Sequence, residues 1–410
     1  HLEGNRVVCK NHNGHFPATQ TSAGETSYDM ASLPPLRVVL LTPPGRGAVA
    51  TVRIEGAGAC ERVDRQFQAA SHRPVAELAG DRLAFGRFRL GEGVYDEVIV
   101  RRPEENVVEI HCHGGPAVVE RLMAALVAED GERISAEDWI RSVHSSPVVA
   151  AAHAALGRAT TLRAAAVLLD QFHGALDRAL QKILDHLRRG EVHAADDRVE
   201  RLLAIAPCGC HLTKPWLVVL AGRPNVGKSS LINALVGYRR AIVHESPGTT
   251  RDLVTAKTAI DGWPVELCDT AGLRMGPDAV EQQGIELALR QLESASLVLL
   301  VFDVAEPWCE EDAELCRRFP NALLVFNKTD LPQASARSRP AGVSVSAIHG
   351  EGIDDLVAAI AHRLVPNPPA SGQPVPFLGE HAAALQAAST ALNQGATHQA
   401  AEWVASLLSR

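Results

Sequence analysis

The spacing of hydrophobic residues changes along the chain and divides it into several regions. Residues 1–35 are mostly polar and show little periodicity, so we expect either a disordered extension or a mis-assigned start there, with Met30 as a plausible initiator. From residue 36 to about residue 140, short apolar runs of strand length alternate with turns, and a single helix is expected at residues 117–128. The expected strands are residues 37–41, 48–54, 82–90, 96–100 and 107–111. This pattern predicts a small α+β domain over residues 36–140.

The next region, residues 141–210, is predicted to be helical. Residues 148–169 favour an amphipathic helix over a membrane span, because His153, Arg158 and Arg163 interrupt the apolar run. A second apolar stripe predicts one face of a single helix that ends at Arg188-Arg-Gly190. The stripe consists of Leu169, Phe172, Leu176, Leu180, Ile183 and Leu187. A further helix is expected at residues 194–205, followed by loop thiols at Cys208-Gly-Cys210-His211.

Residues 211–366 alternate between buried strands and helices, which predicts an α/β domain with a mostly parallel sheet covered on both faces. The apolar strands are expected at residues 216–221, 297–303 and 322–327, and the closing helix at residues 352–364. Residues 253–260 and 263–268 favour a hairpin around Asp261-Gly262. A Pro-rich linker follows, and helices at residues 378–392 and 397–409 complete the helical domain with residues 367–410.

Composition narrows the possible partners and the compartment. The formal net charge of −8 argues against tight nonspecific binding to nucleic-acid phosphates, and no membrane partner is expected. The 8 cysteines show no zinc or disulfide spacing, which indicates a protein of the reducing cytoplasm. His111 and His113 flank Cys112 at a metal-like spacing. We favour strand-end histidines there, because no further ligand cluster follows nearby.

A phosphate-binding loop is the strongest chemical signal. Gly222-Arg-Pro-Asn-Val-Gly-Lys-Ser229 matches the pattern G-x-x-x-x-G-K-[ST] between an expected strand and an expected helix. Its glycines allow the backbone N–H groups to point at phosphate oxygens, and the helix N-terminus adds its positive dipole end. Lys228 is expected to reach the β- and γ-phosphates, and the Ser229 hydroxyl to ligate Mg²⁺.

Further elements stand in the order that a GTPase needs. Gly248-Thr249-Thr250-Arg-Asp252 offers hydroxyls for Mg²⁺ and the γ-phosphate, and Asp269-Thr-Ala-Gly272 offers a carboxylate for the metal's water shell. In Asn327-Lys-Thr-Asp330 a carboxylate can accept from two guanine N–H groups, and Ser346-Ala347 can offer an N–H to guanine O6. The predicted GTP-binding residues are Asn225, Val226, Gly227, Lys228, Ser229, Ser230, His244, Thr249, Thr250, Asp269, Thr270, Ala271, Gly272, Asn327, Lys328, Asp330, Ser346 and Ala347.

With these motifs the chain resembles the MnmE (TrmE) family of tRNA-modification GTPases over roughly residues 37–408. The matching segments are Gly222-Arg-Pro-Asn-Val-Gly-Lys-Ser-Ser230, Gly248-Thr-Thr-Arg-Asp252, Asp269-Thr-Ala-Gly-Leu-Arg274, Gly284-Ile-Glu286, Thr42-Pro-Pro-Gly-Arg-Gly47 and His113-Gly-Gly-Pro116. The resemblance implies a Ras-like P-loop GTPase domain inserted in a helical domain, after a small N-terminal α+β domain.

The resemblance also implies how GTP is hydrolysed, with K⁺ in place of an arginine finger and with paired G domains. Ser229 and Thr250 match the family's Mg²⁺ ligands. The positions that match its K⁺ ligands are Asn225, His244, Ser246 and Thr249. Glu281 matches the catalytic glutamate that orients the attacking water indirectly, although from the residues alone it would be an exposed loop carboxylate.

The family's N-terminal domain binds a formyl-tetrahydrofolate at a dimer interface, and Arg53 and Glu109 match two of those contacts. Other parts of that pattern differ here. The family's glycine-lysine contact has no counterpart in Ser142-Val-His-Ser-Ser-Pro147, and its Cys-hydrophobic-Gly-Lys ending has no match before Arg410. The phrase before Glu109 is also shortened. We therefore expect a divergent member with weak or absent folate binding.

Two functions remain open at this stage. The first is a potassium-dependent GTPase that forms a homodimer and acts with a flavin-dependent protein on the wobble uridine of tRNA. The second is a regulatory or assembly GTPase that hydrolyses GTP but has lost the one-carbon chemistry. A ribosome-assembly GTPase fits less well, because the sequence has no basic run or RNA-binding appendage.

Overall fold

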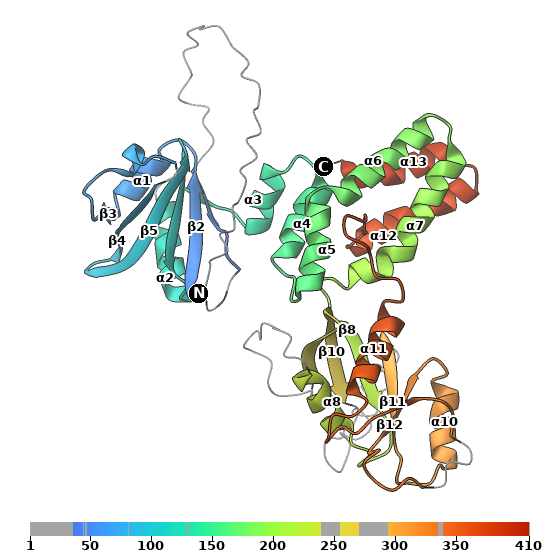
Figure 1. Ribbon diagram of the computed structural model, residues 1–410. Coiled ribbons are helices and arrows are strands. Elements are labelled where there is room, and N and C mark those ends of the chain that lie inside the picture. Colours follow the sequence, from blue (N-terminus) through green and yellow to red (C-terminus); the bar gives the residue numbers. More distant parts are fainter. Residues whose placement is uncertain are drawn as a thin grey trace, which may run out of the picture. The chain divides into compact units, whose positions relative to one another are not determined.

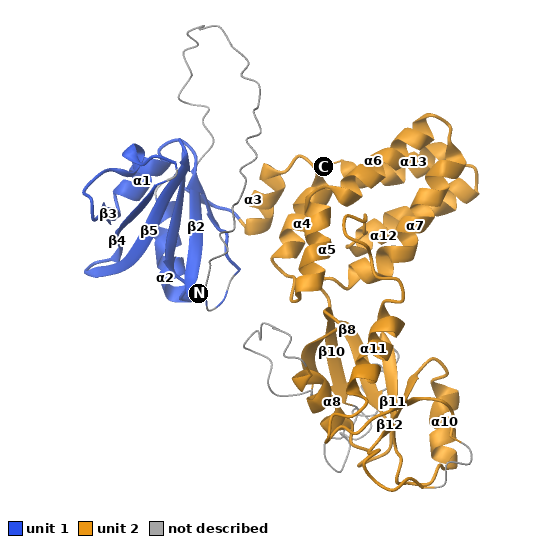
Figure 2. Cartoon of the chain, in the orientation of Figure 1, with its two compact units in different colours: residues 1–134 blue, residues 135–410 orange. Residues whose placement is uncertain are grey.

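The computed structural model describes residues 36–43, 45, 47–80, 82–128, 131–238, 255–269, 294–334 and 339–409 (Figure 1). The predicted disordered extension lies outside these residues. Contacts between residues divide the chain into two compact units, His1–Ile134 and Ser135–Arg410 (Figure 2). The division places residues 135–140 with the second unit.

The first unit is a seven-stranded sheet in the order β3-β4-β5-β6-β2-β1-β7, with helices against it. The strands are β1 Arg37–Leu40, β2 Val49–Glu55, β3 Phe67–Ala69, β4 Leu83–Gly91, β5 Val94–Glu104, β6 Val107–His113 and β7 Glu132–Arg133. The helices are α1 Ala59–Asp64 and α2 Pro116–Val127, and Val75–Glu77 form one 3₁₀ turn. The predicted strands and the predicted helix are confirmed, whereas α1, β3 and β7 were not predicted.

Strict alternation along the strands gives this sheet one buried face. Val52, Ile54, Val108 and Ile110 are fully buried and pack in one core with Leu122 of α2. The other face of the sheet includes Leu83 and Phe85 of β4 and Tyr95 and Ile99 of β5, whose side chains are exposed.

The second unit begins and ends with helices that pack together. These are α3 Ala136–Val143, α4 Pro147–Leu156, α5 Leu162–Phe172, α6 Ala175–Arg188, α7 Val192–Cys210, α12 Gly379–Asn393 and α13 Thr397–Leu408. Helix α12 packs against α7, and α13 packs against α6 and α4. The α/β domain is therefore inserted in a helical domain, as the sequence predicts.

The predicted single helix around the stripe from Leu169 to Leu187 is wrong. Helix α5 ends at Phe172 and α6 begins at Ala175, because Gly174 adopts a left-handed conformation with φ of 85°. The break changes the phase of the buried positions. Leu169 is consequently 44% exposed, while Leu176, Leu180 and Ile183 are fully buried.

Two more helical predictions need correction. The expected helix over residues 148–169 is divided between α4 and α5, because Thr161 caps α5 by accepting a hydrogen bond from the Ala164 N–H at 3.2 Å. The expected loop at Cys208-Gly-Cys210 is the end of α7. A Cβ on Gly209 would lie 1.9 Å from the Pro376 carbonyl oxygen, so a segment far along the chain packs directly on this helix end.

The inserted α/β domain has a six-stranded sheet in the order β13-β12-β11-β8-β10-β9. Its elements are β8 Trp216–Ala221, α8 Lys228–Gly237, β9 Thr255–Ile260, β10 Trp263–Asp269, β11 Leu297–Asp303, α10 Glu310–Arg318, β12 Leu323–Asn327, β13 Val343–Ser344 and α11 Ile353–Leu364. All neighbouring pairs are parallel except β9 and β10, which form the predicted hairpin with Asp261 and Gly262 at positive φ. The mostly parallel sheet is therefore confirmed.

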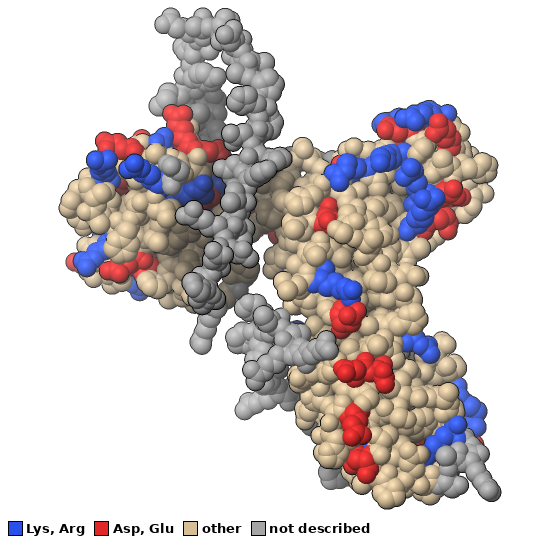
Figure 3. Space-filling model, viewed as in Figure 1, with Lys and Arg blue, Asp and Glu red and all other residues tan. Residues whose placement is uncertain are grey.

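Two further features concern membrane-spanning helices and the charge of the surface. Within the described ranges, no helix combines the length and apolar character needed to cross a membrane. On the face drawn in Figure 3, acidic side chains form a row over the lower part of the second unit, and basic side chains gather over its upper part.

Candidate functional site

The phosphate-binding loop connects the buried strand β8 to the start of α8. Gly222 has a φ of 149° and Gly227 a φ of 93°, a conformation that side chains with a Cβ rarely adopt. Space is also restricted. A Cβ would lie 2.2 Å from the Val301 carbonyl oxygen at Gly222 and 2.3 Å from Asn327 Nδ2 at Gly227. Both glycines are therefore required by backbone conformation and by close packing.

Lys228 and Ser229 lie where the loop joins α8. The Lys228 side chain is buried, and its Nζ donates to the Gly222 and Arg223 carbonyl oxygens at 3.0 and 2.9 Å. The ammonium group is thus held inside the curve of the loop. The Ser229 hydroxyl donates to Asp269 Oδ2 at 2.7 Å.

The pair of Ser229 and Asp269 connects the loop to the end of β10. Asp269 is only 2% exposed, so its carboxylate is fixed beside the loop. A hydroxyl and a carboxylate at this distance are hard oxygen donors of the kind that Mg²⁺ prefers. These two residues fit an Mg²⁺ ion that serves phosphoryl transfer, one as a direct ligand and one through the metal's water.

Asn327 joins three segments of the site through its amide. Its Nδ2 donates to the Val226 carbonyl oxygen at 2.9 Å, and its Oδ1 accepts from the Ala347 N–H at 3.1 Å. Asn327 is 2% exposed, so both bonds are protected from water. Through this one side chain, the end of β12 holds the phosphate loop and the segment after β13 in one arrangement.

Asp330 stands at the outer edge of the same arrangement. Its Oδ1 accepts from the Ser346 hydroxyl at 2.6 Å, and Ser346 Oγ in turn accepts from the His349 N–H at 3.2 Å. The hydrogen bond from Ser346 lowers the pKa of Asp330 below its ordinary value, so the carboxylate is ionised at neutral pH. The fixed, exposed anion suits a ligand edge that carries two N–H donors.

Lys328 occupies the position between these two residues. It has a positive φ of 66°, and its Nζ lies 2.7 Å from Asp303 Oδ2 at the end of β11. This ion pair fixes the Lys328 side chain against the end of β11.

The structure brings together Asn225–Ser230, Asp269, Asn327, Lys328, Asp330, Ser346 and Ala347 in one region at the carboxyl ends of the strands. Asn225 has a left-handed backbone with φ of 63°. The other predicted residues lie outside the described residues. They are His244, Ser246, Thr249, Thr250, Thr270, Ala271, Gly272 and Glu281.

Arg223 is an ion-paired residue of the phosphate loop that the motif pattern misses, because it occupies a variable position of the loop. Its Nε lies 3.0 Å from Asp312 Oδ1, and its Nη2 lies 3.0 Å from Glu306 Oε2. Asp312 is almost completely buried at the start of α10. This buried carboxylate fixes the outer side of the phosphate loop. Sequence reasoning had no signal for the pairing, since about 90 residues separate the partners.

The two predicted folate contacts lie in the first unit, on neighbouring strands. Arg53 of β2 pairs in register with Glu109 of β6, and Arg53 Nη1 lies 3.1 Å from Glu109 Oε1. Arg53 Nε also contacts Glu55 Oε2 at 3.0 Å, and Arg101 approaches Glu109 Oε2 at 3.6 Å. The two residues are therefore adjacent, within a ladder of alternating charges.

His111 and His113 lie at the end of β6 and have separate partners. His111 Nδ1 and the Thr51 hydroxyl are 3.0 Å apart, and His113 Nδ1 lies 2.6 Å from Asp96 Oδ1. Among the described residues, no group of three or more His, Cys, Asp or Glu side chains could hold a metal ion.

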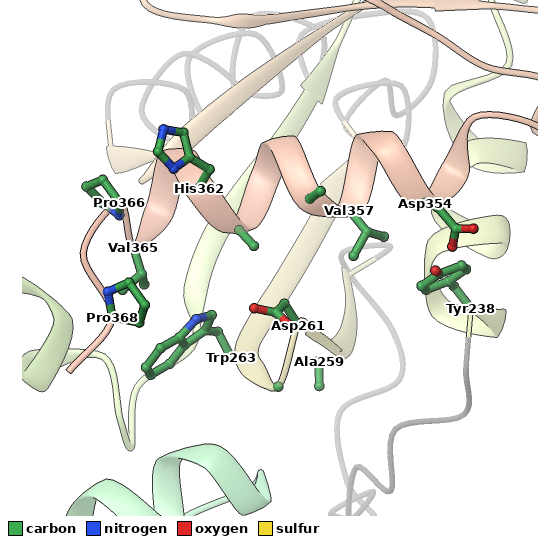
Figure 4. Close-up of a pocket in the computed structure, with 13 residues that line it drawn as sticks. Tyr238, Ala259, Asp261, Trp263, Asp354, Val357, His362, Val365, Pro366 and Pro368 are labelled. Carbon is green, nitrogen blue, oxygen red and sulfur yellow. The ribbon is translucent and has the colours of Figure 1, made fainter. Parts of the chain in front are cut away.

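A cavity of about 590 Å³ lies between the β9–β10 turn and α11 (Figure 4). It is bordered by the β9–β10 turn, by one side of α11 and by Pro366 and Pro368. Trp263 at the start of β10 lines it, whereas Asp269 at the end of β10 lies in the phosphate site. The cavity is therefore separate from the nucleotide motifs.

Comparison with known proteins agrees with both units. The family described as "GTP-binding protein TrmE N-terminus" matches residues 38–138, and that described as "50S ribosome-binding GTPase" matches residues 217–328. The protein named tRNA modification GTPase MnmE from Geobacillus kaustophilus is 35% identical over 78% of this chain and 80% of its own length. Its namesake from Thermus thermophilus is 34% identical over 80% of this chain and 82% of its own length. A crystal structure of Era from Aquifex aeolicus, bound to GDP and AlF4⁻, is 28% identical, with a TM-score of 0.29 over 38% of this chain and 57% of that one.

Proposed function

Because the chain belongs to the MnmE family of tRNA modification GTPases, we propose that it hydrolyses GTP to support modification of the wobble uridine of tRNA. It does so with Mg²⁺ and K⁺ as cofactors, as a homodimer, and together with a flavin-dependent protein. The match of residues 217–328 to a GTPase family supports the hydrolysis of GTP.

One observation carries the choice of nucleotide. The Asp330 carboxylate is braced by Ser346, and the Ala347 N–H is fixed by Asn327, on the two sides of one edge of the site. Guanine presents N1–H and N2–H₂ donors that suit the Asp330 carboxylate, next to an O6 acceptor that can share the Ala347 N–H with Asn327 Oδ1. Adenine presents an acceptor at N1 and a donor at C6, so it would place like groups against each other.

The residues of the phosphate loop supply binding and charge stabilisation. The loop N–H groups and the Lys228 ammonium hold the phosphates, and Ser229 and Asp269 hold Mg²⁺ beside them. The resemblance adds further roles, as proposals: Thr250 as the second Mg²⁺ ligand, Glu281 as the residue that orients the water, and K⁺ bound by Asn225, His244, Ser246 and Thr249. K⁺ would supply the positive charge that an arginine finger supplies elsewhere, a contribution of roughly 10³–10⁵ in rate.

A second candidate is a GTPase that has lost the one-carbon chemistry. This candidate is favoured by residues 142–147, the segment where the family has its glycine-lysine contact. Here Ser146 caps α4 by accepting from the Val149 N–H at 3.3 Å, and it also contacts Asp177. This segment therefore serves helix capping and contributes no cation to a carboxylate-bearing folate.

Complementation separates the two candidates. The chain is expressed in a bacterial strain that lacks its own MnmE, and wobble-uridine modification is measured by mass spectrometry of tRNA. Purified protein is assayed in parallel for binding and hydrolysis of GTP and ATP. Restored modification supports the first candidate, and GTP hydrolysis without modification supports the second. Equal affinity for ATP and GTP would contradict the nucleotide assignment itself.

A further inference from the structure

A contact between the helical domain and the GTPase domain lies at the tip of the β9–β10 hairpin. Arg163, in the first turn of α5, donates from Nη1 to the Asp261 carbonyl oxygen at 2.6 Å and to Asp261 Oδ2 at 2.5 Å. Its guanidinium carbon lies 4.9 Å from the centre of the Trp263 ring. We call these three residues, Arg163, Asp261 and Trp263, the hairpin clamp.

The hairpin turn is shaped to fit this arginine. Asp261 and Gly262 both have positive φ, which is the two-residue turn that favours glycine at its second position. A Cβ on Gly262 would lie 3.1 Å from Arg163 Cβ, so α5 packs directly on the turn. Trp263 is 2% exposed and gives the cation a fixed aromatic surface. Both hydrogen bonds come from one guanidinium nitrogen, so the rest of the planar group can lie over the Trp263 ring.

The same hairpin leads to the nucleotide site at its other end. Strand β10 ends at Asp269, which accepts the hydrogen bond from Ser229. Strand β9 begins at Thr255, shortly after the Gly248–Asp252 motif in the sequence. The two strands are paired from the turn to Cys268 and Thr255, a length of about 20 Å at ~3.3 Å per residue. One paired element thus connects the clamp to both nucleotide motifs.

We propose that Arg163 is a positioning residue for GTP hydrolysis. Arg163 is part of α5 and holds Asp261 and Trp263, so the position of α5 sets the tilt of the β9–β10 hairpin. The tilt of the hairpin in turn sets the position of Asp269. This inference rests on the proposed GTPase function, and it is reciprocal. A nucleotide that repositions Asp269 changes the stability of the clamp by the same factor by which the clamp changes nucleotide binding.

The structure also limits the size of the effect. The side chains of Arg163 and Asp261 are 39% and 59% exposed, and exposed ion pairs contribute little stability by themselves. Strand β10 is also paired with β8 from Val265 to Asp269, so the hairpin can tilt but cannot slide freely. A coupling near the lower end of the usual range, about fivefold, is therefore expected.

The test compares the unaltered chain with three single variants and one double variant. Arg163→Met keeps an aliphatic stem and removes the charged fork, and Asp261→Asn removes the carboxylate. Arg158→Met is the matched control, because Arg158 pairs with Glu137 at 3.4 Å inside the helical domain and lies five residues before Arg163. We expect the affinity for a non-hydrolysable GTP analogue to fall about fivefold in the first two variants and kcat for GTP to fall as well, with both unchanged in the control. The double variant should lose no more than Arg163→Met alone.

A second measurement reports on the clamp without turnover. Amide hydrogen exchange of residues 162–172 is compared between protein bound to GDP and protein bound to a non-hydrolysable GTP analogue. We expect a difference in the unaltered chain and in Arg158→Met, and none in Arg163→Met. Unchanged kcat in Arg163→Met, an equal loss in the control, or exchange independent of the nucleotide would each overturn the proposal. If the unaltered chain does not hydrolyse GTP, the proposed function fails, and the exchange experiment still decides the clamp.

Discussion

Asn327→Asp and Asp330→Asn should have different consequences, although the two positions lie in one motif. The first should lower stability, and the second should change base selection. Asn327 is buried and bonded to Val226 and Ala347. Asn327→Asp keeps the shape and the acceptor for the Ala347 N–H, but it removes the donor to the Val226 carbonyl oxygen. Two oxygen atoms would then face each other at about the present 2.9 Å.

The magnitude follows from burial. A buried carbonyl group without its partner costs about 1–3 kcal/mol, and a buried carboxylate adds to this. We expect Asn327→Asp to lower the free energy of unfolding by about 2–4 kcal/mol at pH 7.5. For a unit of this size that corresponds to a decrease in Tm of roughly 5–15 °C. At pH 5 the loss relative to the unaltered chain should be smaller, because a protonated carboxyl can donate to the Val226 oxygen.

Asp330→Asn should leave Tm unchanged, because Asp330 is exposed and an amide oxygen can still accept the hydrogen bond from the Ser346 hydroxyl. Its effect should instead appear in base selection. GTP affinity should fall at least ~tenfold, and xanthosine triphosphate should bind better than GTP. Calorimetric unfolding and nucleotide titration of both variants provide the comparison. Our reasoning would be refuted by an Asn327→Asp variant as stable as the original chain, or by loss of stability in Asp330→Asn.

Four further predictions concern the metal, the assembly, the first unit and pH. GTP hydrolysis should be faster in K⁺ than in Na⁺ at matched ionic strength, and identical rates would discard the potassium proposal. Sedimentation at micromolar concentration should detect a dimer formed through residues 37–140, and a monomer at all concentrations would remove that proposal. Binding of 5-formyl-tetrahydrofolate should be weak or absent, because Arg53 is already paired with Glu55 and Glu109; micromolar binding that Arg53→Ala abolishes would restore the full one-carbon function. Burial lowers the pKa of His381 from 6.5 to about 4. Between about pH 6.5 and about pH 4, His381 is therefore protonated in the unfolded chain but neutral in the folded chain. The free energy of unfolding falls by up to about 3 kcal/mol as the pH is lowered through this range. His381→Gln should flatten this part of the pH profile of unfolding, which denaturant titrations at several pH values can measure.

The local chemistry of the chain was sufficient for the nucleotide motifs and for most strands. Gly222 and Gly227 are identifiable because a phosphate loop requires backbone conformations that few other residues adopt. The Asp261-Gly262 turn is identifiable for the same reason, and strict alternation located β4 and β6 within a few residues. Each of these features depends on neighbours in sequence, and a pattern along the chain contains that information.

Contacts between distant segments decided the rest. The helical end at Gly209 depends on packing against Pro376, which the apolar spacing does not record. Gln171 appears as a polar residue in an apolar helix, yet it is fully buried, where its amide donates to the Gln373 carbonyl oxygen and accepts from the Val375 N–H, both at 3.1 Å. In the sequence, Arg163 is one cation in an amphipathic pattern. Its contact with a hairpin nearly a hundred residues away is not predictable from that pattern, because no periodicity within either segment specifies the other.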